Sequence, residues 1–325
     1  MSATGKTQPE SGGGKATFLS SLSSQVCYYA ILTAVKIISY IPFKALYALS
    51  DALFYPLYHI ARYRRKIVRK NLVESFLDKG TGEIVRIEKG FYHFFVDTIL
   101  ESCKLMSITP QEMMRRLKFT NVELVNDKLA AGKSVAIFMG HYGNWEWVST
   151  MPLWLYPGAV PAQIYRKLRN GPAERVIMKL RGQMGAVSVE MRDTVRFMAR
   201  GASGGRPHII GFIADQTPRK MEVKHFFNFL NRSVPALTGT EKTAKHFGYE
   251  VVFLSVRRVR RGYYECEFST LHDNPRAAPD FELTSLYYQR LEQEIKREPE
   301  LYLWTHKRFK YAIVDSAQTT DASTS

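Results

Sequence analysis

Short apolar runs that alternate with helical patterns are the feature of this sequence that most constrains its fold. Four such runs cover residues 134–139, 186–189, 208–213 and 251–256. Helical periodicity fills much of the sequence between them, at residues 173–184, 194–200 and 240–247. Because two parallel strands must be joined by a crossover segment, usually a helix, this alternation is typical of an α/β fold. The sequence therefore predicts a mainly parallel central sheet flanked by helices.

Further elements extend this domain on both sides of the apolar runs. Residues 71–130 are predicted to be helical, and residues 263–269 alternate as a strand that pairs with the preceding strand in a hairpin. A last amphipathic helix ending before Pro299 is predicted from its apolar residues, which are Leu283, Leu286, Tyr287, Leu291 and Ile295. We divide the chain into a flexible tail (1–24), an N-terminal segment (25–70), an α/β domain (71–312) and a second flexible tail (313–325).

The N-terminal segment contains the most apolar stretch of the chain, residues 26–60. A helix that spans a bilayer needs about 20 mostly apolar residues, and this stretch is borderline and is interrupted by Pro42. On a helical wheel its polar residues fall on one side, and they are Thr33, Lys36, Ser39, Lys44, Ser50 and Asp51. A single polar stripe favours a helix that lies in the membrane interface or packs against the domain. We predict a membrane-associating helical segment, and the alternative is a long buried helix of a soluble core.

Basic residues follow this stretch directly and dominate the charge of the chain. Six of the nine residues from 62 to 70 are Lys or Arg, and the whole chain has 46 Lys+Arg against 30 Asp+Glu, a net charge of +16. A cluster of this kind is attracted to anionic lipid headgroups by about 1 kcal/mol per charge, although it could also be a solvated helix face. The excess charge indicates a polyanionic partner. No helix-turn-helix, zinc or RNP-like pattern supports nucleic acid, which leaves an anionic membrane surface and a phosphorylated substrate. The position of the cluster directly after the apolar stretch favours a membrane surface as the partner of these residues.

The sharpest chemical motif is a histidine flanked by glycines and followed by an acid. It comes directly after the first apolar run, where α/β folds place active-site residues, and it reads Gly140-His141-Tyr142-Gly143-Asn144-Trp145-Glu146. We expect the turn from this strand into a helix to bring His141 against Glu146. A histidine held by a carboxylate is an oriented general base that can remove a proton from an alcohol near neutral pH. The alternative is a structural histidine.

A metal site is not predicted at this motif. The sequence has no second histidine at ligand spacing near His141, and its three cysteines are far apart. A second pattern, Gly201-Ala202-Ser203-Gly204-Gly205, matches the nucleophile elbow of hydrolases by its letters. That elbow needs a strand before the serine and a helix after it, whereas here a predicted helix precedes and a predicted strand follows. We therefore do not expect Ser203 to be a nucleophile.

Other polar residues are predicted to join the histidine at the ends of the strands. Asp215 and Gln216 follow the apolar run 208–213, which places them on the same sheet edge, where Asp215 could hold a substrate hydroxyl or form a turn. Arg166 and Arg181 belong to a group of arginines that we expect to form a basic rim around this edge, and arginine is a natural phosphate ligand.

Several blocks of the sequence, taken in order, resemble the late (secondary) acyltransferases of bacterial lipid A biosynthesis, within the lysophospholipid acyltransferase superfamily. The His-x4-Glu motif of that family is matched by His141 and Glu146. The blocks that follow are Tyr165-Arg166, Arg181 with Gly185, Asp215-Gln216, Ser233-Val234-Pro235-Ala236, and Leu303-Trp304-Thr305-His306-Lys307-Arg308-Phe309-Lys310. The resemblance covers about residues 25–310.

The resemblance implies an enzyme that moves a fatty acyl chain from an acyl carrier protein thioester to a hydroxyl of a lipid A precursor, with no metal or organic cofactor. It implies anchorage at the cytoplasmic face of the bacterial inner membrane and catalytic roles for His141 and Glu146. The substrate-binding residues that it implies are Asn144, Arg166, Arg181, Asp215 and Gln216. Two alternatives remain: an acyltransferase for another glycolipid or lysophospholipid, and a non-catalytic basic protein that binds membranes or nucleic acid.

Overall fold

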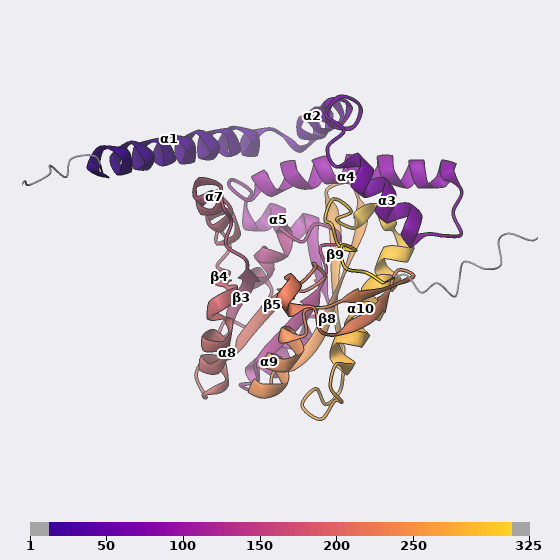
Figure 1. Cartoon of the computed structure of the whole chain (residues 1–325). Coiled ribbons are helices and arrows are strands. Elements are labelled where there is room, and N and C mark those ends of the chain that lie inside the picture. Colours follow the sequence, from indigo (N-terminus) through magenta and orange to yellow (C-terminus); the bar gives the residue numbers. More distant parts are fainter. Residues whose placement is uncertain (1–12, 314–325) are drawn as a thin grey trace, which may run out of the picture.

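The computed structural model describes residues 13–313, with side chains from residue 23 onward (Figure 1). The α-helices are α1 (Gly13–Tyr40), α2 (Phe43–Tyr55), α3 (Arg65–Ser75), α4 (Thr81–Lys104), α5 (Pro110–Arg116), α6 (Glu123–Ala130), α7 (Gly171–Arg181), α8 (Thr194–Ala202), α9 (Gly239–Phe247) and α10 (Glu282–Arg297). Short π or 3-10 turns are η1 (Pro56–Ile60), η2 (Trp147–Leu153), η3 (Met191–Asp193), η4 (Lys220–Glu222) and η5 (Pro299–Leu301). Helix α1 thus begins inside the predicted tail 1–24, and the rest of the predicted tails lies almost wholly outside the described residues.

Seven strands form one mainly parallel sheet, as predicted. The strands of the structure are β1 (Leu117–Thr120), β2 (Val135–Met139), β3 (Val160–Tyr165), β4 (Val187–Glu190), β5 (His208–Ile213), β6 (Phe226–Phe229), β7 (Arg232–Pro235), β8 (Glu250–Arg260) and β9 (Tyr263–Thr270). The order in the main sheet is β1-β9-β8-β2-β5-β3-β4, and β6 pairs separately with β7. Every neighbouring pair in the main sheet is parallel except β8 and β9, which form the predicted antiparallel hairpin.

The centre of the sheet is strand β2, whose five residues are all buried. A strand buried on both faces reads as a continuous apolar run, which is why the sequence pattern located it. Helix α10 packs on β2 and β8, and α6 packs on β2 and β9. In the register of β2 with β5, Met139 lies opposite Ile213, so the two strands end at the same level. This register determines which residues meet at the sheet edge.

Four features of the main chain differ from the predictions: β1, β3, the β6–β7 hairpin and the turn after β2. Strand β1 lies inside the segment 71–130 that was predicted to be helical, and it pairs with β9 at the edge of the sheet. Because β1 has four residues, it is too short for an alternation of apolar and polar residues to be recognised in the sequence. Strand β3 contains Pro161 and is only partly buried, so it shows no continuous apolar run. The β6–β7 hairpin lies outside the main sheet and shows no such run either. The turn after β2 leads into the 3-10 helix η2, in place of the expected α-helix.

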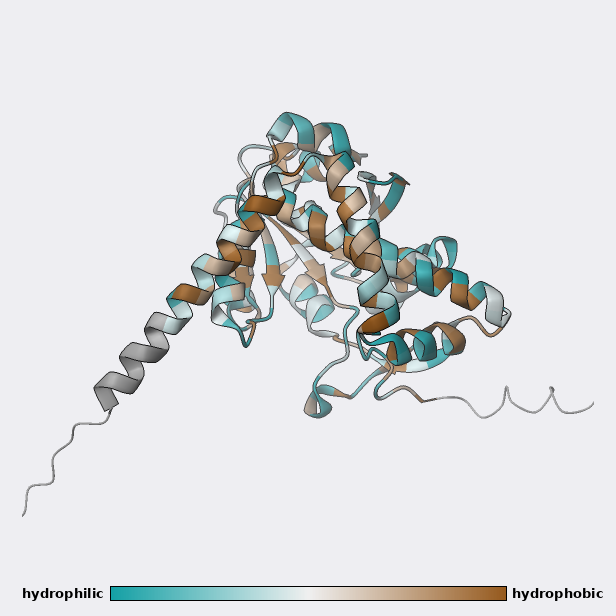
Figure 2. Ribbon diagram, turned by 90° about the horizontal axis from the view of Figure 1, so that it is seen from above, coloured by the Kyte–Doolittle hydropathy of each residue, from teal (hydrophilic) through white to brown (hydrophobic). Residues whose placement is uncertain are grey.

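The N-terminal segment breaks at Pro42, as predicted, between α1 and α2. Part of its polar stripe faces the protein: Ser39 and Ser50 are fully buried, and Asp51 pairs with Arg261. The apolar side chains Val26, Tyr29, Ile37 and Tyr40 are 60–68% exposed instead. Figure 2 shows the described part of α1 at the edge of the molecule, where one side packs on α4 and α7 and the other is exposed, so α1 is not a buried core helix. Within residues 13–313, no helix is both long enough and apolar enough to cross a bilayer.

The basic cluster at residues 62–70 divides into two groups. Arg65 and Arg69 both donate to the buried carboxylate of Glu88 on α4, so these two arginines hold α3 in place. Lys66 and Arg62 are exposed. Because Val68 and Leu72 of α3 are completely buried, α3 is part of the domain core and only part of the cluster is available to a partner.

Candidate active site

His141 and Asp215 meet at the carboxyl edge of the sheet. His141 follows β2 and Asp215 follows β5, and the parallel register of these strands brings the two residues together. The ring atom His141 Nδ1 lies 2.7 Å from Asp215 Oδ1. Only 3% of the Asp215 side chain is exposed, against 17% of the His141 side chain. The carboxylate therefore lies behind the ring, and the ring is the part of the pair that solvent and substrate can reach.

This contact assigns the tautomer of the His141 ring. Asp215 is a hydrogen-bond acceptor, so Nδ1 carries the proton and Nε2 has a free lone pair. The side-chain nitrogen of Gln216 lies 3.3 Å from Nε2, where an amide N–H donates to that lone pair. Burial alone would raise the pKa of the Asp215 carboxyl, but the adjacent His141 and the buried Arg308 outweigh it and hold that pKa below its usual range. Asp215 is therefore an ionised, fixed partner for His141 at neutral pH.

Glu146 does not hold His141, contrary to the sequence prediction. Its two carboxylate oxygens accept hydrogen bonds from Arg181 of α7, with Nε–Oε2 at 2.8 Å and Nη2–Oε1 at 2.6 Å. Trp145 Nε1 also donates to Glu146 Oε1, at 3.2 Å. Burial opposes ionisation of Glu146, but Arg181 outweighs it and lowers the pKa of the carboxyl. The bidentate arginine is a stronger partner than a neutral imidazole, so Glu146 and Arg181 form a second pair near the histidine.

The glycines of the motif allow the loop to fit between two packed elements. A Cβ atom at Gly140 would lie 2.5 Å from Leu291 Cδ1 on α10. Gly143 has a φ of +62°, in the left-handed region, and a Cβ there would lie 2.4 Å from Val256 Cγ1 on β8. Both positions thus require glycine for space, and Gly143 also requires it for backbone conformation.

Asn144 and Arg166 occupy very different environments. Asn144 is completely buried, its Nδ2 donates to Glu101 Oε2 at 2.7 Å, and its Oδ1 accepts from the Trp147 N–H at 3.1 Å. Both polar atoms of Asn144 are thus bonded inside the protein, where they fix the loop, and its predicted contact with substrate stays a prediction. Arg166 follows β3, the neighbour of β5, and is exposed at the same sheet edge. Arg181, also predicted to bind substrate, is occupied by Glu146.

A segment late in the chain completes the site, and we call residues 301–308 the C-terminal strap. Leu303 N–H donates to the His141 carbonyl at 3.1 Å, and Gly143 N–H donates to the Leu301 carbonyl at 3.0 Å. On the other side, Thr217 Oγ1 donates to the Arg308 carbonyl at 2.8 Å. The C-terminal strap therefore binds the loop after β2 and the loop after β5, which carry the two members of the His141–Asp215 pair.

Two side chains of the C-terminal strap were not predicted to have a role at the site. Arg308 is 1% exposed and donates from Nη2 to the Tyr288 hydroxyl, while its Nε and Nη1 have no hydrogen-bond partner within the described part of the chain. Burial lowers the pKa of His306 to about 4, against the opposing charge of Asp215, so this ring is neutral at pH 7. Both residues lie in the last block of the family resemblance, but no spacing rule connects that block to His141.

The predicted order of elements around Ser203 is confirmed. Ser203 caps the end of α8, and strand β5 follows it, so the order of helix and strand is the reverse of a nucleophile elbow. In residues 23–313, no three His, Cys, Asp or Glu side chains are grouped so that they could hold a metal ion. The chemistry that the described site offers is that of a histidine base with an aspartate partner.

The fold and the site together define an α/β protein with a histidine–aspartate pair at the carboxyl edge of its mainly parallel sheet. Residues 15–311 match the family described as bacterial lipid A biosynthesis acyltransferase. The chain therefore belongs to the lipid A biosynthesis acyltransferase family, as the resemblance indicated, and the chemistry of this family is acyl transfer. A search of curated proteins found no match to the chain.

Proposed function

We propose that the protein transfers a fatty acyl chain from an acyl carrier protein thioester to a hydroxyl of a lipid A precursor. The observation that carries the proposal is the His141–Asp215 pair, which turns Nε2 away from the carboxylate and toward the Gln216 amide, in a chain of an acyltransferase family. The net charge of +16 fits both substrates, since the precursor carries phosphates and the carrier protein is acidic. Exposed Arg166, which follows β3 at the same sheet edge, is the residue we assign to the acceptor phosphate.

The mechanism that we propose uses His141 twice. The acceptor hydroxyl takes the position of the Gln216 amide at Nε2 and gives its proton to that nitrogen, while Asp215 stabilises the imidazolium. The alkoxide oxygen attacks the thioester carbonyl carbon, the C–O bond forms and the C–S bond breaks. The proton on Nε2 then passes to the leaving sulfur, which departs as the thiol of the carrier protein. Glu146 contributes by holding Arg181 and takes no proton in this scheme.

The reaction is tested directly with purified protein, an acyl–acyl carrier protein and a tetra-acylated lipid A precursor in detergent. We expect mass spectrometry to show a precursor that is heavier by one acyl chain, together with free carrier protein thiol. A parallel incubation replaces the precursor with a lysophospholipid. Acylation of the lysophospholipid alone would reject the lipid A acceptor and favour the alternative acyltransferase, and acylation of neither lipid would contradict the proposed reaction.

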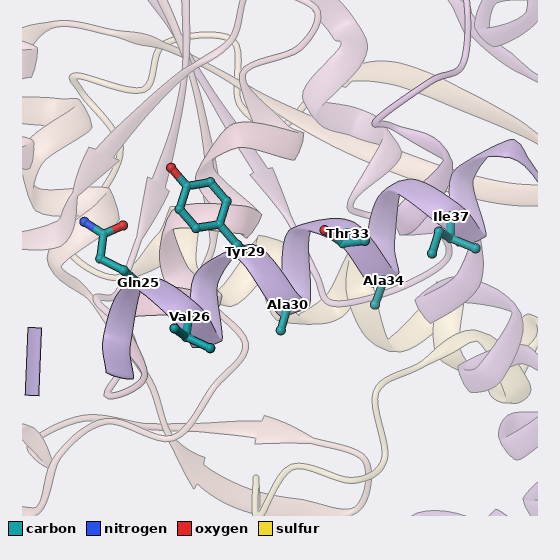
Figure 3. A pocket seen from close by; sticks show the side chains of 7 residues that line it. All are labelled: Gln25, Val26, Tyr29, Ala30, Thr33, Ala34 and Ile37. Atoms are coloured by element: carbon teal, nitrogen blue, oxygen red, sulfur yellow. The ribbon is translucent and has the colours of Figure 1, made fainter. Parts of the chain in front are cut away.

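We further propose that α1 binds an anionic membrane surface on the cytoplasmic face of the bacterial inner membrane. Figure 3 shows side chains along α1, which line a shallow hollow formed by α1 alone: Gln25, Val26, Tyr29, Ala30, Thr33, Ala34 and Ile37. The opposite side of α1 packs on the domain. There Cζ of Arg175 on α7 lies 3.9 Å from the centre of the Tyr28 ring. An apolar row left exposed on a helix that is held in place is typical of a lipid-binding surface.

Polar substitution of this row is expected to weaken binding to lipid without unfolding the domain. Replacing Val26, Tyr29 and Ile37 by glutamine removes exposed side chains whose burial in lipid contributes about 1.5–3 kcal/mol each when complete. We expect binding to vesicles of phosphatidylethanolamine and phosphatidylglycerol to fall at least about 10-fold in a flotation assay. The matched control replaces exposed apolar residues elsewhere (Met191, Val195 and Val259) by glutamine and should bind as the parent does. Equal loss in both triple variants would show that α1 is not the lipid-binding surface.

A further inference from the structure

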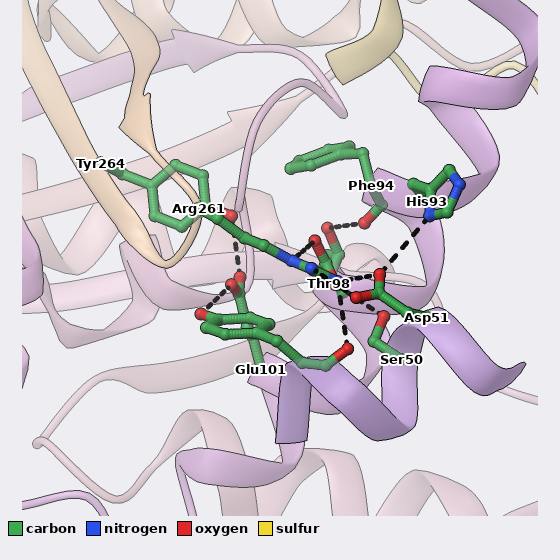
Figure 4. Close-up of polar contacts among 10 residues, drawn as sticks. Ser50, Asp51, His93, Phe94, Thr98, Glu101, Arg261 and Tyr264 are labelled. Carbon is green, nitrogen blue, oxygen red and sulfur yellow. Dashed lines mark hydrogen bonds and ion pairs between the residues drawn. The ribbon is translucent and has the colours of Figure 1, made fainter. Parts of the chain in front are cut away.

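A completely buried carboxyl group, Glu101 of α4, lies beneath the loop that carries His141. It is 0% exposed, and three side chains donate hydrogen bonds to it. The Tyr47 hydroxyl lies 2.8 Å from Oε1, the Tyr264 hydroxyl lies 2.8 Å from Oε2, and Asn144 Nδ2 lies 2.7 Å from Oε2. Figure 4 shows Tyr264 of β9 and Glu101 facing each other across this cluster. Both oxygens of the carboxyl are therefore in use.

Glu101 fixes the loop after β2 at two points. Its side chain holds Asn144, which is three residues after His141 and two before Glu146. Its backbone carbonyl accepts a hydrogen bond from Trp147 Nε1 at 2.9 Å. Asn144 Oδ1 in turn accepts the Trp147 N–H, so the two anchors are also bonded to each other. One residue on α4 thus determines the path of the loop between the histidine and the start of η2.

Burial of this carboxyl is unfavourable on its own. Burial raises the pKa of Glu101 to about 7, and well-packed apolar residues often stabilise a core more than a buried acid does. A fully bonded polar cluster instead specifies one geometry, because any displacement leaves a buried donor or acceptor unpaired. That property is useful where a loop must hold reacting groups in place, since an error of about 1 Å can lower a rate about 100-fold.

A neighbouring cluster resembles this one but does not reach the loop. Ser50 of α2 donates to Asp97 Oδ1 at 2.6 Å, and Arg261 binds both Asp97 and Asp51 (Figure 4). This cluster joins α2 to α4 and to the turn between β8 and β9. It offers a matched control, because Ser50 is also completely buried and its hydroxyl donates to Asp97 of α4, not to the loop of residues 141–147.

We propose that Glu101 is the positioning residue of the catalytic loop, acting through Asn144 and Trp147 to hold His141 at the sheet edge. The inference rests on the proposed acyl transfer, for which His141 must meet Asp215 and the acceptor hydroxyl in a fixed geometry. Glu101 itself touches no substrate in this scheme. Its contribution lies in the orientation of the loop and is separate from any proton transfer.

The decisive experiment exchanges the two bonded groups. Asn144→Asp places a second carboxyl group against the Glu101 carboxyl and removes the amide donor between them. We expect kcat to fall about 100-fold with KM within about twofold of the parent. The double variant Glu101→Gln/Asn144→Asp restores an amide donor facing a carboxylate, and we expect kcat to return to within about threefold of the parent. Glu101→Gln alone should also keep near-parental kcat, because its amide oxygen can face Asn144 and its nitrogen can donate to Tyr47.

Controls distinguish this inference from the proposed function and from general destabilisation. An inactive parent would reject the proposed reaction. If the parent is active, a parental kcat in Asn144→Asp would overturn the positioning role. So would a double variant that folds but does not recover kcat. Ser50→Ala should leave kcat unchanged. If Asn144→Asp does not fold by circular dichroism, Tyr47→Phe/Tyr264→Phe decides: it removes two donors to Glu101 without altering the loop, and an unchanged kcat would overturn the inference.

Discussion

Replacing His141 by alanine is expected to lower the rate of acyl transfer by at least about 100-fold while the protein remains folded. A positioned general base contributes about 10²–10⁴ to a rate, and the Nε2 atom of His141 is the base in the proposed mechanism. The ring is only partly buried, so its removal leaves a small, accessible gap at the sheet edge and no large core cavity. The measurement is transfer of labelled acyl chains from acyl carrier protein to the lipid A precursor, with circular dichroism as the test of folding.

His246→Ala is the matched control for this variant. His246 lies on α9, is exposed and has a ring contact only with its neighbour Phe247 among the described ring pairs. It should keep parental activity and parental stability. Near-parental activity of His141→Ala, in a preparation whose parent is active on the same acceptor, would exclude His141 as the base.

Replacing Asp215 by asparagine is expected to lower kcat by about 10²–10⁴ with little change in KM. The amide has the same size and can still accept a hydrogen bond from Nδ1, but it lacks the charge that stabilises the imidazolium, and its NH₂ group can favour the wrong tautomer of the ring. Because the pKa of Asp215 is held below its usual range, the parent keeps this charge through the neutral range and loses it only as the pH falls through that lowered value.

The control for Asp215→Asn is Asp280→Asn, which alters a surface carboxylate that pairs with Lys245. The double variant His141→Ala/Asp215→Asn should be little slower than His141→Ala alone, since Asp215 acts through the ring. Additive losses in the double variant would mean that Asp215 acts on the substrate directly, as one reading of the sequence allowed.

The sheet and the position of the site were predictable because both depend on local patterns. Runs such as residues 208–213 mark buried strands, and parallel strands bring the residues after them to one edge, which places Asp215 near His141. The pairing itself was not predictable. Glu146 is nearer in sequence and was expected to hold the ring, but Arg181, 35 residues further on, binds that carboxylate and leaves His141 to Asp215.

The contacts that reach across the chain could not be predicted from the sequence either. Nothing in the spacing of residues indicates that Glu101, inside a helix of regular periodicity, bonds to Asn144 of the loop. A buried carboxyl and a surface carboxyl look alike in a sequence, and only the packing of α2, α4 and β9 around it shows the difference. The same holds for Arg308, whose basic neighbours Lys307 and Lys310 are exposed while it is buried.

The C-terminal strap has a consequence for when the enzyme can first work during its synthesis. A ribosome makes the polypeptide from its N-terminus, so His141 and Asp215 emerge well before residues 301–308. Until then the amide of Gly143 and the carbonyl of His141 lack their backbone partners, and the two loops have nothing to join them at this edge. A nascent chain that has been translated only as far as α10 thus contains His141 and Asp215 but lacks the C-terminal strap that joins their two loops. The two loops can be joined at this edge only after Arg308 has been translated and has folded back onto the sheet.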